Sequence, residues 1–490
     1  MITIILAAIL VTSGCLGISE NEEIDPNSPL HDESEIDIFS ELDPFALIHI
    51  PEKFDNTEMT GKSAVPRTYR DVSIDALDYW GMPHQLTNDV FTNFKSNSFN
   101  FSTLILIEPN FSALQNARGW SDERNSPVLI IETTNIGSEV SDYFGIFDHG
   151  TVQNFTSWDY SNYEEEFQDS ISISDANPSN ISFEESSWTA TPLIQDVNAN
   201  SFAFIKFENN GTIFYMYVAE SYYPGVGVNN HHMMILNYLQ ESDVNHQRTP
   251  NIAETITPIV LRLDDLRYTA QIDEWSEYYD ACNNISIGYI PENSNLSSDD
   301  LKDNFPQADI IPHGYSHEDW HELNSSQAKI TATKSSDAMF NITGIYPNGM
   351  IMPYNHLGFQ AAQGLQEAGF LWATSSISQS KYPSNIWFDD GERFIQFSNY
   401  FSPSSWSTSE GTIHEFINES ESNFLGGMVI FHPNRAFQEG EIEHEISIID
   451  QLLGLEESDK IVIMTLSEFM EYHFNRISPI VYYEDSNSGD

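Results

Sequence analysis

Basic residues and cysteines are scarce in this sequence of 490 residues. Nineteen lysines and arginines stand against 74 aspartates and glutamates, which gives a formal net charge of −55. A chain with so little positive charge repels nucleic acids and anionic lipid surfaces, so we expect no nucleic-acid partner. The acidic residues are spread along the chain rather than gathered in a tail, which indicates an acidic, salt-tolerant surface.

Only two cysteines occur, Cys15 and Cys282. Cys15 follows a short apolar run at residues 2–11, which is too short to span a bilayer and is typical of a signal-peptide core, although no lysine or arginine precedes it. The small residues before Cys15 resemble a lipobox, so we expect an exported protein held at the cell surface by a lipid on Cys15. With Cys15 lipidated, the mature chain has no intramolecular disulfide, and we expect neither a cysteine-based metal site nor a cysteine protease. A buried N-terminal strand is the alternative.

Length and composition divide the chain into segments. A sequence of 490 residues is too long for one core, so two or three domains are expected. Strands and helices alternate in both halves, which favours parallel α/β sheets. The predicted segments are a signal peptide at 1–15, an acidic disordered tether at 16–44, an α/β domain at 45–240, a polar linker at 241–258, a barrel at 259–478 and a polar tail at 479–490.

The first α/β domain has a hairpin signal at Asn209-Asn210-Gly211 between two apolar runs. Its element order resembles the flavodoxin-like sheet of class I glutamine amidotransferases. No cysteine lies between Cys15 and Cys282, so the catalytic cysteine of those enzymes has no counterpart, and we expect a smaller, non-catalytic parallel-sheet domain. The adjacent His231 and His232 diverge by about 100° on a helix and are interpreted as surface histidines.

In the second half, polar side chains follow the ends of predicted strands. Asp264 and Asp265 end the strand 259–263, while His313, Tyr354 and His432 each follow a later strand. In a parallel α/β barrel these strand ends share one face, where such folds hold their active sites. Side chains that are distant in sequence are therefore expected to converge there.

The spacing of His313 and His317 suggests a metal site. On a helical turn, residues four apart point to one side and can hold one cation, with an aspartate from the strand end as third ligand. Such a ligand set leaves positions open on Zn²⁺ for water and substrate, although Co²⁺ or Ni²⁺ would fit equally. The remaining carboxylate can take a proton from the attacking water, and His432 can return one to the leaving group.

These motifs resemble the polysaccharide deacetylases, carbohydrate esterase family four, over about residues 256–475. The resemblance implies a distorted (β/α) barrel and a hydrolase that removes acetyl groups from a polysaccharide. It further implies a role for each residue: Asp264 as general base, His432 as general acid, Asp265, His313 and His317 as metal ligands, and the Tyr354 backbone N–H as a donor to the substrate oxyanion.

Three positions depart from the family pattern. Leu266 stands where glycine is usual, Gly314 where serine or threonine is usual, and Ile351 where an arginine normally orients the base. Arg262 is two residues before Asp264 and therefore on the same strand face. We expect its guanidinium to hold Asp264 ionised and oriented in place of the missing arginine.

Two functions of different class stay open. The favoured one is a lipid-anchored, monomeric deacetylase acting on an acetylated polysaccharide, with the membrane contacted only through the lipid. The alternative is a non-catalytic surface protein that binds glycan or metal with a degenerate barrel. A metal phosphatase is disfavoured because Arg262 and Arg267 are the only basic residues near the predicted site. His356 is interpreted as a rim contact and Asp389-Asp390-Gly391 as a turn.

Overall fold

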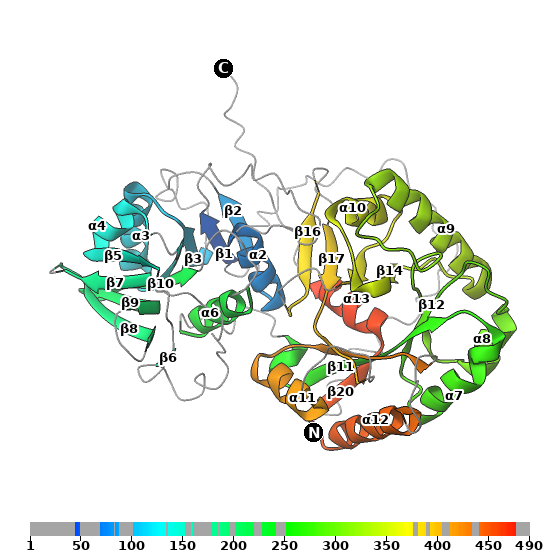
Figure 1. Ribbon diagram of the computed structural model, residues 1–490. Coiled ribbons are helices and arrows are strands. Elements are labelled where there is room, and N and C mark those ends of the chain that lie inside the picture. Colours follow the sequence, from blue (N-terminus) through cyan, green and yellow to red (C-terminus); the bar gives the residue numbers. More distant parts are fainter. Residues whose placement is uncertain are drawn as a thin grey trace, which may run out of the picture. The chain divides into compact units, whose positions relative to one another are not determined.

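A computed structural model describes most of the chain (Figure 1). Cys15, the predicted tether, half of the predicted linker, the Asp389-Asp390-Gly391 stretch and the polar tail lie outside the described residues. No helix within the described ranges has the length and apolar character needed to cross a membrane. The described residues are 45–49, 69–82, 84–87, 101–133, 136–151, 158–159, 179–184, 186–196, 201–219, 228–241, 251–375, 381–388, 393–403, 412–433 and 441–476.

Contacts along the chain separate residues 1–43 from a compact unit at 44–490. Every described helix and strand belongs to the second unit. The division of that unit into two domains around residues 241–258 stays a prediction from the sequence.

The strands before residue 220 form one mixed sheet. Strands β2, β1, β3, β4 and β10 lie side by side and parallel, as expected from the alternation of strands and helices. The sheet continues through antiparallel strands that the sequence analysis largely missed. The elements are β1 (Phe45–His49), α2 (Tyr69–Tyr79), β2 (His84–Thr87), β3 (Phe101–Ile107), α3 (Phe111–Arg124), β4 (Val128–Thr133), α4 (Ser138–Phe144), β5 (Ile146–Thr151), β6 (Trp158–Asp159), β7 (Ser179–Phe183), β8 (Thr189–Asp196), β9 (Ser201–Asn209), β10 (Thr212–Ala219) and α6 (Val228–Glu241).

The predicted hairpin in this sheet is confirmed. Strands β9 and β10 pair antiparallel around Asn210 and Gly211, which both have positive φ, of 54° and 92°. A two-residue turn with that backbone matches the twist of the strands it joins, and asparagine and glycine adopt it at low cost. The interpretation of His232 was wrong: it is fully buried, and its ring stacks on Tyr382 at 4.1 Å between ring centres.

From residue 257 onward, strands and helices alternate, and the strands form two sheets. One sheet has the order β13-β12-β11-β19-β18, with β20 also paired to β11, and the other has the order β14-β15-β17-β16. All pairs are parallel except β16 with β17. Figure 1 shows α7, α9, α10 and α12 outside these strands, the arrangement of a distorted (β/α) barrel, which confirms the predicted fold class.

The strand predicted at 259–263 lies within β11, and helices follow the strands as the alternation predicts. Helix α8, strands β16 to β18 and helix α11 were not predicted. The elements are β11 (Thr257–Leu266), α7 (Ile272–Ala281), β12 (Ser286–Tyr289), α8 (Ser298–Asn304), β13 (Asp309–Pro312), α9 (Ser325–Thr343), β14 (Gly349–Ile351), α10 (Phe359–Glu367), β15 (Trp372–Thr374), β16 (Ser384–Trp387), β17 (Arg393–Phe397), β18 (Tyr400–Phe401), α11 (Ile413–Ser422), β19 (Gly427–Phe431), α12 (Glu441–Glu457), β20 (Ile461–Met464) and α13 (Leu466–Arg476), with short 3₁₀ turns at Ile252–Glu254, Thr269–Gln271 and Pro353–Asn355.

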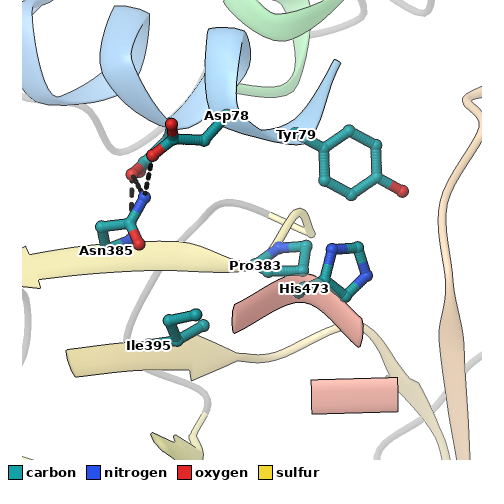
Figure 2. A pocket seen from close by; sticks show the side chains of 7 residues that line it. Asp78, Tyr79, Pro383, Asn385, Ile395 and His473 are labelled. Carbon is teal, nitrogen blue, oxygen red and sulfur yellow. Dashed lines mark hydrogen bonds between the residues drawn. The ribbon is translucent and has the colours of Figure 1, made fainter. Parts of the chain in front are cut away.

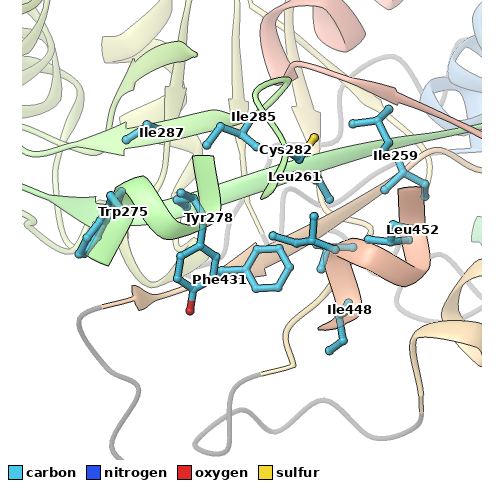
Figure 3. Close-up of a cluster of buried hydrophobic side chains, with 14 of the residues drawn as sticks. Ile259, Leu261, Trp275, Tyr278, Cys282, Ile285, Ile287, Phe431, Ile448 and Leu452 are labelled. Atoms are coloured by element: carbon cyan, nitrogen blue, oxygen red, sulfur yellow. The ribbon is translucent and has the colours of Figure 1, made fainter. Parts of the chain in front are cut away.

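Strand β11 is the centre of the second half, because both of its faces are buried. Ile259, Leu261 and Leu263 pack into the hydrophobic cluster beneath α7 and α12, part of which Figure 3 shows. Val260 belongs to a different cluster, on the inner side of the strands. Side chains alternate along a strand, so Arg262 also takes the inner side. The same alternation that anchors β11 in the core therefore aims its polar end into the barrel.

Helix α2 contacts β16 through buried polar groups, shown in Figure 2. The Asn385 amide nitrogen donates hydrogen bonds to Asp75 at 2.7 Å and Asp78 at 3.1 Å, and the rings of Tyr79 and His473 stack at 5.4 Å. The small pocket at this contact is lined by buried side chains that hydrogen-bond or stack on one another. We interpret it as a packing feature, separate from the residues with candidate chemistry.

Helices α9 and α10 approach closely at Gly364. A Cβ atom there would lie 2.4 Å from the Ser325 carbonyl oxygen and 2.6 Å from the Ala328 Cβ.

We predict that Gly364→Ala lowers the free energy of unfolding by about 1–3 kcal/mol, because the two helices must separate. Gly454, in α12, has no atom within 4 Å of such a Cβ. Gly454→Ala is therefore the matched control and should be neutral or stabilising by up to about 1 kcal/mol. Denaturant unfolding measures both, and equal effects would contradict the packing described here.

Candidate metal and catalytic site

The two adjacent aspartates at the end of β11 have separate surroundings. Both are almost fully buried, with 2% of Asp264 and 5% of Asp265 exposed. The strand pairing with β12 is interrupted between Leu263 and Leu266, and Asp265 has a φ of 74°, in the left-handed region. Regular alternation would point Asp265 to the face opposite Arg262 and Asp264, but at this irregularity the Asp265 carboxylate lies beside His313, whose charge also acts on Asp264. Each buried carboxylate therefore needs its own positive partner.

Arg262 is the partner of Asp264. Its Nε and Nη2 donate to the two carboxylate oxygens at 2.7 and 2.5 Å, and Arg262 is only 1% exposed. Burial alone would raise the pKa of Asp264, but the charge of Arg262, aided by His313 and His432, outweighs it and holds that pKa below its usual value. The carboxylate stays ionised and keeps lone pairs that can accept a proton. The contact expected from the strand alternation is thus present.

Asp265, His313 and His317 converge on one point. The Asp265 Oδ1 lies 3.3 Å from His313 Nε2 and 3.1 Å from His317 Nε2. One ligand atom from each of the three residues lies within 4.8 Å of the others. Ligands about 2.0–2.2 Å from a tetrahedral zinc ion are separated by about 3.3–3.6 Å, close to these distances. The residues therefore fit a divalent ion.

The protonation of His313 supports the same interpretation. Its Nδ1 lies 3.2 Å from the Ile351 carbonyl oxygen, which only accepts hydrogen bonds, so Nδ1 carries a proton. In the neutral ring, Nε2 then presents a lone pair to the Asp265 oxygen. Two lone pairs 3.3 Å apart repel unless a proton or a metal ion lies between them. A carbonyl bonded to the distal ring nitrogen is also the usual outer-shell partner of a metal-bound histidine.

The segment that joins the two histidines is a loop and not the predicted helical turn. Gly314 and His317 both have positive φ, of 68° and 71°. The Glu318 carboxylate accepts hydrogen bonds from the backbone N–H groups of Tyr315 and Ser316, at 3.1 and 2.8 Å, and so fixes the loop. The two imidazoles face each other because of this loop geometry, with ring centres 4.9 Å apart.

The departure at Gly314 has a structural reason. A Cβ there would lie 2.9 Å from Glu318 Oε2 and 3.0 Å from the Pro353 ring, on a backbone with positive φ. Serine or threonine at this position would be strained in this chain. Leu266, the first departure, is fully buried in the cluster beneath α7 and α12.

His432 and Tyr354 complete the predicted set. His432 Nε2 lies 3.8 Å from Asp264 Oδ2, which is beyond hydrogen-bonding distance, and its side chain is 12% exposed. Tyr354 lies in the 3₁₀ turn after β14 and is 57% exposed, and its ring is 4.7 Å from that of His317. The structure therefore brings together Arg262, Asp264, Asp265, His313, His317, Tyr354 and His432.

Other residues of this region carried no signal in the sequence. Asn355 and Thr374 accept hydrogen bonds from Arg262, and Gly288 lets β12 pass beside Asp264, since a Cβ there would lie 3.0 Å from Asp264 Oδ1. Only a three-dimensional arrangement identifies these three residues, because their types and spacing match no motif. His356, which the sequence analysis interprets as a rim contact, contacts Asp319 at 3.2 Å on the surface.

We predict that the protein binds about one equivalent of Zn²⁺ through the three converging residues. Asp265→Ala and His317→Ala each remove a ligand and should weaken binding by more than the 10- to 100-fold typical of losing an outer-shell partner. His356→Ala is the matched control, because it removes a nearby surface imidazole and should leave affinity unchanged. Isothermal titration calorimetry and elemental analysis measure the affinity and stoichiometry. Unchanged zinc affinity in both ligand variants would rule this site out.

Comparisons with known proteins match this chain only at the level of three-dimensional structure. No family model matches the sequence, and no curated protein matches it. Agd3, a carbohydrate deacetylase, is 10% identical over 89% of this chain and 88% of its own, with a TM-score of 0.39. A family 4 acetyl xylan esterase from Clostridium thermocellum, solved with cobalt, is 11% identical over 44% and 91%, with a TM-score of 0.32. The peptidoglycan deacetylase PdaC from Bacillus subtilis is 13% identical over 46% and 94%, with a TM-score of 0.30. The solved structures to which this chain is similar thus include many deacetylases, at low identity.

Proposed function

We propose that this protein is a metal-dependent hydrolase that removes acetyl groups from a glycan. The observation that carries the proposal is a buried carboxylate held by Arg262 next to a separate carboxylate–imidazole–imidazole set. A purely structural ion pair explains Asp264 but leaves the convergence of Asp265, His313 and His317 without a purpose. The glycan and its acetyl group as substrate are inferred from the resemblance of the sequence motifs to polysaccharide deacetylases.

Asp264 acts as the general base in this proposal. It stays ionised at neutral pH because Arg262 lowers its pKa, and the same contact fixes its orientation. The attacking water gives up a proton to Asp264 as its oxygen bonds to the acetyl carbon. The low pKa makes Asp264 a weak base, so the water must itself be acidified. Asp265, His313 and His317 would hold a divalent ion, which would supply that acidification and polarise the acetyl carbonyl.

Tyr354 and His432 act on the substrate. The backbone N–H of Tyr354, in the turn after β14, donates to the oxygen that gains negative charge during attack. His432, 3.8 Å from Asp264, donates a proton to the leaving nitrogen or oxygen of the sugar as the bond from that atom to the acetyl carbon breaks. The products are acetate and a sugar with a free amine or hydroxyl group. Zn²⁺ suits the ligands, and Co²⁺ or Ni²⁺ would suit them as well.

One observation favours the non-catalytic alternative. Both oxygens of Asp264 already accept from Arg262, so the carboxylate is tightly held and only weakly basic. A protein that binds glycan or metal without hydrolysis needs no base at all. Measured turnover separates the two functions.

We predict chelator-sensitive release of acetate from acetylated chito-oligomers or acetylated xylan. His432→Ala should lower kcat by about 10²- to 10³-fold, since it removes the proton donor, and should leave zinc stoichiometry unchanged. His356→Ala is the control and should keep wild-type turnover. An assay of free acetate, with and without chelator, measures these rates. Absence of chelator-sensitive release from both substrate types would favour the non-catalytic alternative.

A second prediction concerns the base. Arg262→Met removes the charge that keeps Asp264 ionised, so the pKa of Asp264 rises. As the pH is lowered, Asp264 is then protonated, and activity is lost, at a higher pH than in the wild type. We expect a fall in kcat/KM at neutral pH and an acid limb of the rate profile shifted to higher pH. Arg267→Met is the matched control, because the side-chain hydrogen bonds of Arg267 go to Glu292 and not to Asp264. If Arg262→Met kept both turnover and the acid limb of the wild type, Arg262 would have no part in activating the base.

A further inference from the structure

Arg262 makes more contacts than the orientation of Asp264 requires. An arginine has five N–H donors, and two of them serve the carboxylate. Nη1 donates to the Thr374 hydroxyl at 3.2 Å, and both Nη1 and Nη2 lie 3.3 Å from the Asn355 Oδ1. All five donors thus have acceptors, on β11, on β15 and in the turn after β14. The guanidinium joins three strand ends at the bottom of the site.

The turn that Asn355 belongs to has a costly backbone. Tyr354 and Asn355 have φ of 58° and 54°, and two consecutive non-glycine residues in the left-handed region are unfavourable by roughly 1–2 kcal/mol each. Backbone hydrogen bonds from Asn355 to Met352 and from His356 to Pro353, at 3.0 and 3.1 Å, close the turn. The Tyr354 side chain is exposed, and its ring lies 4.7 Å from that of His317. The contact from Asn355 to the buried Arg262 is the hydrogen-bonded attachment of this turn to β11.

Thr374 supports the same attachment from the other side. Its hydroxyl oxygen accepts from Arg262 and also from the Met352 backbone N–H, at 3.2 and 3.3 Å. Met352 directly precedes the turn, so both flanks of the turn are tied to the one guanidinium that holds Asp264.

We propose that Asn355 is a positioning residue that fixes the Tyr354 N–H relative to the base, through Arg262. This rests on the proposed function, in which the Tyr354 N–H receives the developing negative charge and Asp264 receives the proton of water. The oxygen that accepts from Tyr354 N–H and the water oxygen that loses its proton to Asp264 are bonded to the same tetrahedral carbon. The distance between the Tyr354 N–H and Asp264 must therefore be held while charge develops. A misplacement of about 1 Å in such a pair costs on the order of 10²-fold in rate.

The test uses two substitutions at Asn355 in the full-length protein. Asn355→Ala removes the side-chain contact and keeps the cost of a left-handed backbone, whereas Asn355→Gly removes the contact and also removes that cost. We expect both to lower kcat by about 10²-fold while KM stays near the wild-type value, since the lost interaction acts only in the transition state. Zinc stoichiometry should stay at one equivalent in both. Thr374→Val should lower kcat in the same way, and Thr374→Ser, which keeps the hydroxyl, should restore it.

Asn125→Ala is the matched control. Asn125 is an exposed asparagine with φ of 52° at the end of α3, so its substitution imposes the same backbone cost far from Arg262. It should lower stability without changing kcat.

Wild-type kcat in Asn355→Gly would overturn the proposal, because the backbone cost alone would then explain the alanine variant. A rise in KM with unchanged kcat would also overturn it. The two proposals can fail separately. If the wild type shows no chelator-sensitive acetate release, the proposed function fails, and with it this role of Asn355. If the wild type and both Asn355 variants are equally active, only the positioning role fails.

Discussion

The site depends on how two adjacent buried carboxylates are each matched by positive charge. A buried ion without a partner costs several kcal/mol, so neither Asp264 nor Asp265 is stable in this position alone. The left-handed backbone at Asp265 breaks the regular alternation of β11 at this point. Asp264 then pairs with Arg262, and Asp265 turns to the two imidazoles. One carboxylate is held by a fixed side-chain cation, and in the proposed function the other binds an exchangeable one. This difference is what allows the two residues to take different roles in the proposed reaction.

Backbone strain collects around the same residues. Asp265, His317, Tyr354 and Asn355 all have positive φ, and none is glycine. Such conformations persist only where surrounding contacts hold them, and they are common at functional sites. Here the contacts are the hydrogen bonds of Glu318 to its own loop and of Arg262 to Asn355. The rigid, buried strands β11 and β13 provide the frame, and short strained turns aim the side chains into the opening.

Much of this arrangement follows from the sequence. The period-two alternation of 259–264 places Arg262 and Asp264 on one face, and the structure has them in contact. The order of strands and helices after residue 257 gives the barrel, and each polar motif follows a strand as expected. The expected helical turn at 313–317 was wrong, because residues four apart also meet across a loop whose shape is set by positive φ at Gly314 and His317. The antiparallel half of the first sheet, the buried position of His232 and the roles of Asn355 and Thr374 depend on contacts between distant segments, which no local pattern encodes.

The most direct test is the position of a metal ion in crystals of this protein grown with Zn²⁺, located by its anomalous scattering. We expect one strong peak about 2.0–2.2 Å from an oxygen of Asp265 and from Nε2 of His313 and His317, with Asp264 still paired to Arg262 and not bound to the ion. A peak coordinated by Asp264, or zinc bound elsewhere with these three side chains unliganded, would contradict the division of roles between the two aspartates.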